Sequence, residues 1–252
     1  MAPIMRESGS GLHGEASERC VGMQTQPVIP RHEPRWHASL AVLAAVALYV
    51  TLPPRLTIGP TWAAPALVLV LLIPLSVIAP RRHSETRKTR FWSIILIAIV
   101  NFFNLASVLL LIASFFEPAK ASAAHAGLLL RTGAQIWFTN ILVFALWFWE
   151  IDGDGPDARA HANAATEFSN ADFLFPQMQM TIAGGGASSC IDPLWKPQFF
   201  DYFYLAFTNA TAFSPADVMP LSVWAKALMG AQALISLITI AIVLARAISL
   251  IG

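Results

Sequence analysis

Five long apolar runs constrain this chain more than any other feature of its sequence. They cover about residues 36–52, 61–79, 91–116, 128–149 and 224–251. Most of them approach or exceed the roughly 20 apolar residues that a membrane-crossing helix needs. Hydrophobic residues make up 56% of the chain and charged residues only 12%, about half the charged share of a soluble domain. The sequence therefore predicts an all-α, polytopic transmembrane helical bundle.

The first 35 residues differ from the rest of the chain. They are polar, rich in Gly, Ser, Pro and Arg, and contain no apolar core of the kind that a signal peptide needs. We expect residues 1–35 to form a disordered cytoplasmic tail. The net charge of +1 does not indicate a nucleic-acid partner, and Cys20 and Cys190 belong to no metal or disulfide motif. We therefore expect no metal site and no cofactor.

The distribution of Lys and Arg predicts the orientation. Four Arg lie in residues 1–35 and five Arg or Lys lie in residues 80–90, whereas the connections near Arg55 and Lys120 have two or three. By the positive-inside rule, the tail and residues 80–90 face the cytoplasm. We expect a multi-pass protein of the bacterial inner (plasma) membrane, with both termini and the loop 150–197 cytoplasmic.

The predicted domain organisation has three parts after the tail. Residues 36–149 form a four-helix transmembrane region, residues 150–197 a long and mostly irregular loop, and residues 198–252 a C-terminal helical hairpin. The loop begins with "EIDGDGPD". This stretch lacks a calcium-loop pattern, since the twelfth position counted from Asp152 is Asn163 rather than Glu. We interpret it as an acidic, solvated helix exit.

The hairpin begins with "PQFFDYFYLAFTNATAF", residues 197–213. As a helix these 17 residues extend about 25 Å, less than a hydrocarbon core of about 30 Å. They predict a sixth helix, fifth in chain order, that is short or re-entrant. At 100° per residue, polar side chains occupy one half and Phe and Ala mostly the other. We expect the polar half to face inward, because unsatisfied polar groups are costly in hydrocarbon.

The last helix offers a complementary polar stripe that includes Gln232 and Ser236. In a hairpin these side chains lie level with Asp201 near mid-membrane, and Asp217 lies in the turn. An intramembrane carboxylate is a functional-site candidate. Asn101, Asn104 and Asn140 are predicted to hydrogen bond between helices as packing contacts. The candidate polar path consists of Asp201, Tyr204, Thr208, Asn209, Thr211, Gln232 and Ser236.

Residues 201–251 weakly resemble the pore-helix and inner-helix segment of two-helix potassium channels. A short aromatic helix precedes Thr211-Ala-Phe-Ser-Pro-Ala-Asp217, and Pro220 and an apolar helix follow. Both filter glycines of the potassium channels are absent, so the carbonyl ring that selects potassium is not expected. The predicted orientation also differs, since a channel pore loop enters from outside.

A closer resemblance is to a family of bacterial predicted integral membrane proteins of unknown function. It rests on a motif in the last quarter to third of the chain, carried by Asp201, Tyr202, Tyr204, Ala206, Phe207, Thr208, Phe213 and Asp217. This resemblance implies a multi-helix inner-membrane protein and implies no activity.

Two functions remain open from the sequence. One is an ion channel-like or transporter-like protein with the polar path described above. The other is a structural or regulatory membrane subunit without transport activity. No nucleophile elbow, HExxH or Walker sequence is present, so we do not expect an enzyme. The candidate partners are the lipid bilayer, further copies of the chain, and a small cation or proton.

Overall fold

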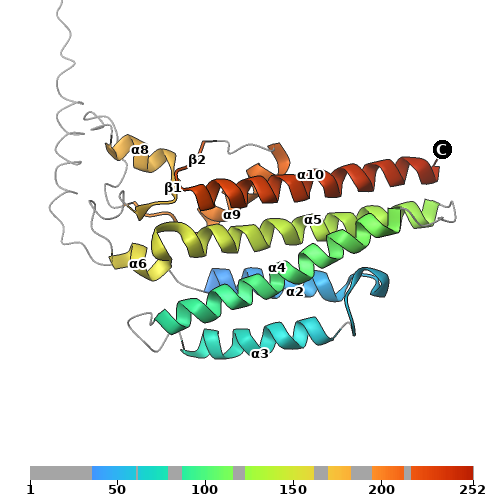
Figure 1. Ribbon diagram of the computed structural model, residues 1–252, viewed down its shortest axis with the longest axis horizontal. Coiled ribbons are helices and arrows are strands. Elements are labelled where there is room, and N and C mark those ends of the chain that lie inside the picture. Colours follow the sequence, from blue (N-terminus) through green and yellow to red (C-terminus); the bar gives the residue numbers. More distant parts are fainter. Residues whose placement is uncertain are drawn as a thin grey trace, which may run out of the picture.

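The computed structural model describes most of the chain after the N-terminal tail (Figure 1). The described residues are 36–60, 62–78, 87–115, 123–161, 170–182, 195–212 and 217–251. The predicted disordered tail, residues 1–35, lies outside them. The same holds for parts of the loop 150–197 and for residues 213–216.

Five main helices run back and forth along one bundle (Figure 1). They are α2 (Trp36–Val50), α3 (Ala63–Ile78), α4 (Arg87–Phe115), α5 (Ala123–Ile151) and α10 (Val223–Ile251), with the 3-10 turn η1 (Pro54–Leu56) after α2. Within the described residues α4, α5 and α10 are long and apolar enough to cross a membrane. The helices α2 and α3 have 15 and 16 residues, about 22–24 Å. The helical fold class and a membrane protein are thus supported, although six crossings are not shown.

Helix α5 forms the centre of the bundle. Ile141, Val143 and Ala145 are all fully buried, because α2, α4, α9 and α10 pack around this helix. Helix α10 lies along one edge of the bundle in Figure 1 and is far less covered than α5. Of the most apolar stretch of α10, 28% is buried, against 56% for that of α5. One long face of α10 is therefore open in the single chain.

Several short elements gather beyond the C-terminal end of α5. They are η3 (Asp152–Asp154), α6 (Pro156–His161), β1 (Phe173–Leu174), α8 (Pro176–Ile182) and β2 (Met219–Pro220). The two strands are antiparallel, with Phe173 opposite Pro220 and Leu174 opposite Met219. The described part of residues 150–197 thus contains more regular structure than the sequence predicted, because Gly153 and Gly155 allow a tight reversal there.

Helix α9 (Phe199–Ala212) runs antiparallel to α5. At one end the rings of Trp149 and Phe199 are 6.0 Å apart, and about three turns back along α5 the rings of Trp137 and Phe207 are 6.3 Å apart. Later residues of α9 thus lie beside earlier residues of α5. Helix α9 therefore begins at the end of the bundle where α5 finishes.

Helix α10 also runs antiparallel to α5. Asn140 contacts Ser236, and a Cβ on Gly133 would meet Val243. Because α9 and α10 both oppose α5, they are parallel to each other, and β2 brings the chain back beside β1 before α10 starts. The predicted antiparallel hairpin of residues 198–252 is therefore wrong. We call α9 together with β2 the re-entrant segment, since both α9 and α10 begin at the same end of the bundle.

The first and last described residues lie at opposite ends of the bundle. Thr51, just after α2, accepts a hydrogen bond from Gln135 in the N-terminal half of α5, so α2 starts near the C-terminal end of α5. Helix α10 starts at that same end and finishes at the other (Figure 1). The prediction that both termini lie in the cytoplasm stays a prediction, since residues 1–35 and Gly252 lie outside the described residues.

Candidate functional site: the re-entrant helix and its contacts

Asp201 lies in the first turn of α9, at the end of the bundle. Its Oδ2 accepts a hydrogen bond from the backbone N–H of Gln198 at 2.7 Å. The Asp201 N–H in turn donates to the Gln198 carbonyl at 2.9 Å. A carboxylate in the first turn also interacts favourably with the helix dipole. The prediction that Asp201 lies level with Gln232 near mid-membrane is therefore wrong, because α10 starts at the same end of the bundle as α9 and runs parallel to it.

Four oxygen-bearing side chains form one row along α9. Asp201, Tyr204, Thr208 and Thr211 are spaced at i, i+3, i+7 and i+10, which places them within an arc of about 80°. Tyr204 and Thr211 are exposed, and Asp201 and Thr208 are partly exposed. We call these four residues the outward stripe, since they lie on the side of α9 that the described part of the chain leaves exposed or partly exposed.

The hydroxyl groups of the two threonines in the outward stripe donate hydrogen bonds to backbone carbonyls of α9 itself. Thr208 Oγ1 donates to the carbonyls of Tyr204 and Leu205, both at 3.0 Å. Thr211 Oγ1 is 2.9 Å from the carbonyl of Phe207 and 3.1 Å from that of Thr208. Each hydroxyl oxygen therefore presents lone pairs outward, and a group that approaches the stripe meets acceptors.

The opposite side of α9 carries a different set of polar contacts. Asn209 Nδ2 donates to Gln232 Oε1 at 2.7 Å and to the Met229 carbonyl at 2.9 Å. Gln232 Nε2 donates to the Ala206 carbonyl at 2.8 Å. Asn140 Nδ2 donates to Ser236 Oγ at 3.0 Å. We call Asn140, Asn209, Gln232 and Ser236 the buried polar cluster.

The buried polar cluster joins three helices. All four side chains are at most 2% exposed, and they connect α5, α9 and α10. The amide of Asn104 on α4 also approaches Asn140, at the long distance of 3.5 Å. These contacts bear out the prediction that Asn140 hydrogen bonds between helices. The cluster stabilises helix packing, as polar groups inside membrane bundles often do.

The structure divides the seven predicted path residues into two groups. Asn209, Gln232 and Ser236 come together in the buried polar cluster, whereas Asp201, Tyr204, Thr208 and Thr211 lie in the outward stripe. The prediction that the whole polar half of α9 faces inward is thus wrong for the stripe. The reason is that Ala206 and Ala210, both fully buried, allow α9 to pack closely through its small residues. Asp217 is exposed on the return to β2.

A second polar group lies where α5 ends, and Asp152 is its centre. Asp152 is 1% exposed. Its Oδ1 accepts the backbone N–H groups of Asp172 at 2.7 Å and Phe173 at 3.2 Å. Its Oδ2 accepts the hydroxyl of Tyr202 at 2.5 Å. One carboxylate therefore contacts both the strand β1 and the helix α9.

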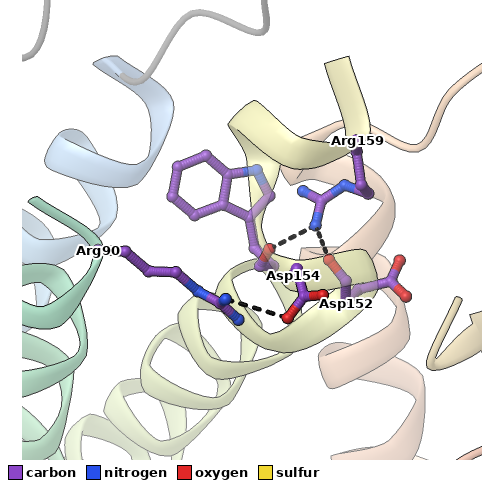
Figure 2. A network of polar contacts seen from close by, with 5 residues as sticks. Arg90, Asp152, Asp154 and Arg159 are labelled. Atoms are coloured by element: carbon purple, nitrogen blue, oxygen red, sulfur yellow. Dashed lines mark hydrogen bonds and ion pairs between the residues drawn. The ribbon is translucent and has the colours of Figure 1, made fainter. Parts of the chain in front are cut away.

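Two arginines surround this reversal of the chain (Figure 2). Arg159 donates to the carbonyls of Trp149 at 2.8 Å and Asp152 at 2.5 Å, and its guanidinium lies 5.0 Å from the ring centroid of Tyr202. Arg90 at the start of α4 pairs with Asp154 at 3.1 Å. The charged groups thus connect α4, α5 and α6 at one end of the bundle.

The prediction of a solvated acidic exit at residues 150–157 is wrong for two of its acids. Glu150 and Asp152 are buried, and only Asp154 is largely exposed. Sequence reasoning missed Asp152, Arg159 and Tyr202 as a group. The available signal was the pair Gly153 and Gly155, both at positive φ, which is typical of a tight reversal rather than a solvated helix end.

Searches of protein-family models, of curated proteins and of solved structures found no match to this chain. Within the described residues, no group of three or more His, Cys, Asp or Glu is placed to hold a metal ion.

Proposed function

We propose that the protein is a channel-like membrane protein in which small cations or protons move along the outward stripe. The observation that carries this proposal is the row Asp201, Tyr204, Thr208 and Thr211 on the open side of a helix that enters the bundle and stops within it. Such a row places a carboxylate at the entrance and acceptor oxygens further in.

The chemistry of the stripe favours a cation. Helix α9 contains one carboxylate and no Lys, Arg or His. Its C-terminal end, with the partial negative charge of a helix terminus, lies part-way along α5 beside Trp137 rather than at an end of the bundle. Beyond the first turn of α9, where the backbone N–H groups carry a partial positive charge, an anion on this path meets electron-rich groups, whereas a cation or a proton is attracted by them.

The exposure of the stripe supports a path between chains. Polar side chains and helix ends are not left facing lipid hydrocarbon, and they occur at membrane depth where protein or water covers them. Among the described residues of the single chain, the outward stripe is exposed or partly exposed and much of α10 is uncovered. We propose that further copies of the chain cover this face and that the path runs between them.

The basic residues at one end of the bundle indicate how the protein is oriented in the membrane. Arg90, the last of the basic residues 80–90, pairs with Asp154 at the end where α9 enters. By the positive-inside rule this end faces the cytoplasm, with residues 150–197 inside and the end of α10 outside. The membrane we propose is the bacterial plasma membrane.

A structural or regulatory subunit without transport activity is the second candidate. It is favoured by the buried polar cluster, in which Asn209 and Gln232 satisfy each other instead of lining a path. In this case the outward stripe is the contact surface for a partner chain, and its hydroxyls are packing groups.

Flux measurements on liposomes that contain the purified protein distinguish these candidates. The probes are potassium efflux and proton uptake, measured separately. We expect Asp201→Asn, Thr208→Val and Thr211→Val to lower the flux without changing folded yield. Thr239→Val is the matched control, since Thr239 is buried on α10 and its hydroxyl donates to the Ile235 carbonyl. Wild-type flux no higher than that of empty liposomes would contradict transport and favour the second candidate.

A further inference from the structure

The re-entrant segment has two arms that meet at one carboxylate. The entry arm is α9, whose Tyr202 donates its hydroxyl to Asp152 Oδ2 at 2.5 Å. The exit arm is β2, which pairs with β1, and β1 begins at the backbone groups that donate to Asp152 Oδ1. Asp152 is therefore the residue through which both arms reach the end of α5.

The contacts of the exit arm continue into the last helix. The Leu221 N–H donates to the Asp172 carbonyl at 2.8 Å, and the Asp172 N–H donates to Asp152. Leu221 lies two residues before α10 begins. A short chain of hydrogen bonds thus connects the carboxylate to the point where the chain leaves the re-entrant segment.

The surroundings hold the carboxylate and the phenol in place. Tyr202 is fully buried, and its ring packs edge-on against Phe175, with centroids 5.4 Å apart. Arg159 covers the other part of the ring and donates to the Asp152 carbonyl. Lys196, just before α9, donates to the Arg159 carbonyl. The side chains that fix Asp152 come from segments up to 50 residues away in sequence.

We propose that Asp152 is a positioning residue that clamps both arms of the re-entrant segment to the end of α5. Through Tyr202 it holds α9 at its depth in the bundle, and through β1 it holds the return to α10. The clamp acts separately from the buried polar cluster, which holds α9 further along its length. This inference concerns the position of the segment and does not depend on transport.

The clamp has a consequence that ordinary core packing does not have. Loss of the Tyr202 hydroxyl breaks the contact of Asp152 with the entry arm only. Loss of the Asp152 carboxylate breaks its contacts with both arms. The rest of the bundle keeps its own core around Ile141 and Ala145, which are fully buried. The two variants therefore loosen different sets of backbone amides, and neither set includes the centre of α5.

Hydrogen–deuterium exchange on the full chain in lipid nanodiscs tests this inference. In Tyr202→Phe we expect the amides of α9 to exchange about tenfold faster, which corresponds to about 1.4 kcal/mol, while β1, β2 and the centre of α5 keep their rates. In Asp152→Ala we expect α9, β1 and β2 to exchange faster together, again with α5 unchanged. Local opening of this kind is what exchange reports.

Tyr204→Phe is the matched control, because it removes the same hydroxyl from an exposed position two residues along the same helix. We expect it to leave all of these rates unchanged. The inference is overturned if Tyr202→Phe leaves α9 unchanged, or if α9 and the centre of α5 accelerate by the same factor. The second result would show a general loss of stability without a clamp.

Discussion

Asn209 and Gln232 form the closest polar contact between α9 and α10. The Asn209 amide donates to Gln232 Oε1 at 2.7 Å, and the Gln232 amide donates to the Ala206 carbonyl at 2.8 Å. Both side chains are at most 2% exposed. This reciprocal arrangement fixes the rotation of α9, and therefore decides which of its polar residues face outward.

Replacement of Gln232 with leucine removes a hydrogen-bond partner from the Asn209 amide and from the Ala206 carbonyl, which are both buried. We expect Gln232→Leu to lower the free energy of unfolding by about 1–2 kcal/mol, the usual cost of unsatisfied buried groups, reduced by the membrane setting. The measurement is denaturant unfolding in detergent micelles. Gln135→Leu is the control, since Gln135 bonds Thr51 at an exposed position. Equal losses in the two variants would contradict a special role for Gln232.

The contact of α5 with α10 depends on Gly133. A Cβ at this position would overlap the side chain of Val243, which is branched at Cβ and cannot easily move aside. We expect Gly133→Ala to cost about 1–3 kcal/mol of stability, as overpacking does. Thermal unfolding of Gly133→Ala, Val243→Ala and the double variant completes a cycle. We expect the double variant to lose less stability than the sum of the single losses. Strict additivity would show that the two residues do not touch.

The backbone at Asp154 is held in a left-handed conformation, with φ of 65°. Asp154→Gly and Asp154→Ala both remove the ion pair with Arg90, so their difference reports the backbone alone. We expect the glycine variant to be more stable by about 1 kcal/mol, because alanine is strained at positive φ. Ala158→Gly in α6 is the control for the same change at a helical position, where glycine is expected to destabilise the protein. A more stable Asp154→Ala would contradict the left-handed turn.

Much of the fold follows from hydropathy. The apolar runs predicted the positions of α2, α3, α4, α5 and α10, because long apolar segments without charges form helices in a membrane. The return of the chain to the starting end of α9 before α10 did not follow, since hydropathy does not reveal where a chain turns back. The predicted short length of this helix agrees with the structure, in which its 14 residues extend about 21 Å.

The candidate site was predictable only in part. The helical period correctly grouped Asp201, Tyr204, Thr208 and Thr211 on one side of α9. Which side faces the bundle depends on the close approach of Ala206 and on the partners of Asn209 in α10. Gly153 and Gly155 indicated a tight reversal at Asp152, but its partners were not predictable, because Tyr202 and the backbone of β1 are 50 and about 20 residues away.

We propose that α9 enters the membrane and that the chain returns to the same side before α10 begins. The most direct test labels single cysteines at Gln198, Leu221 and Ser249 in intact and permeabilised cells, with Cys20→Ser and Cys190→Ser. These three positions are exposed. We expect Gln198 and Leu221 to be labelled from the same side and Ser249 from the other. Labelling of Gln198 and Leu221 from opposite sides would show that α9 crosses the membrane, and would contradict the re-entrant segment.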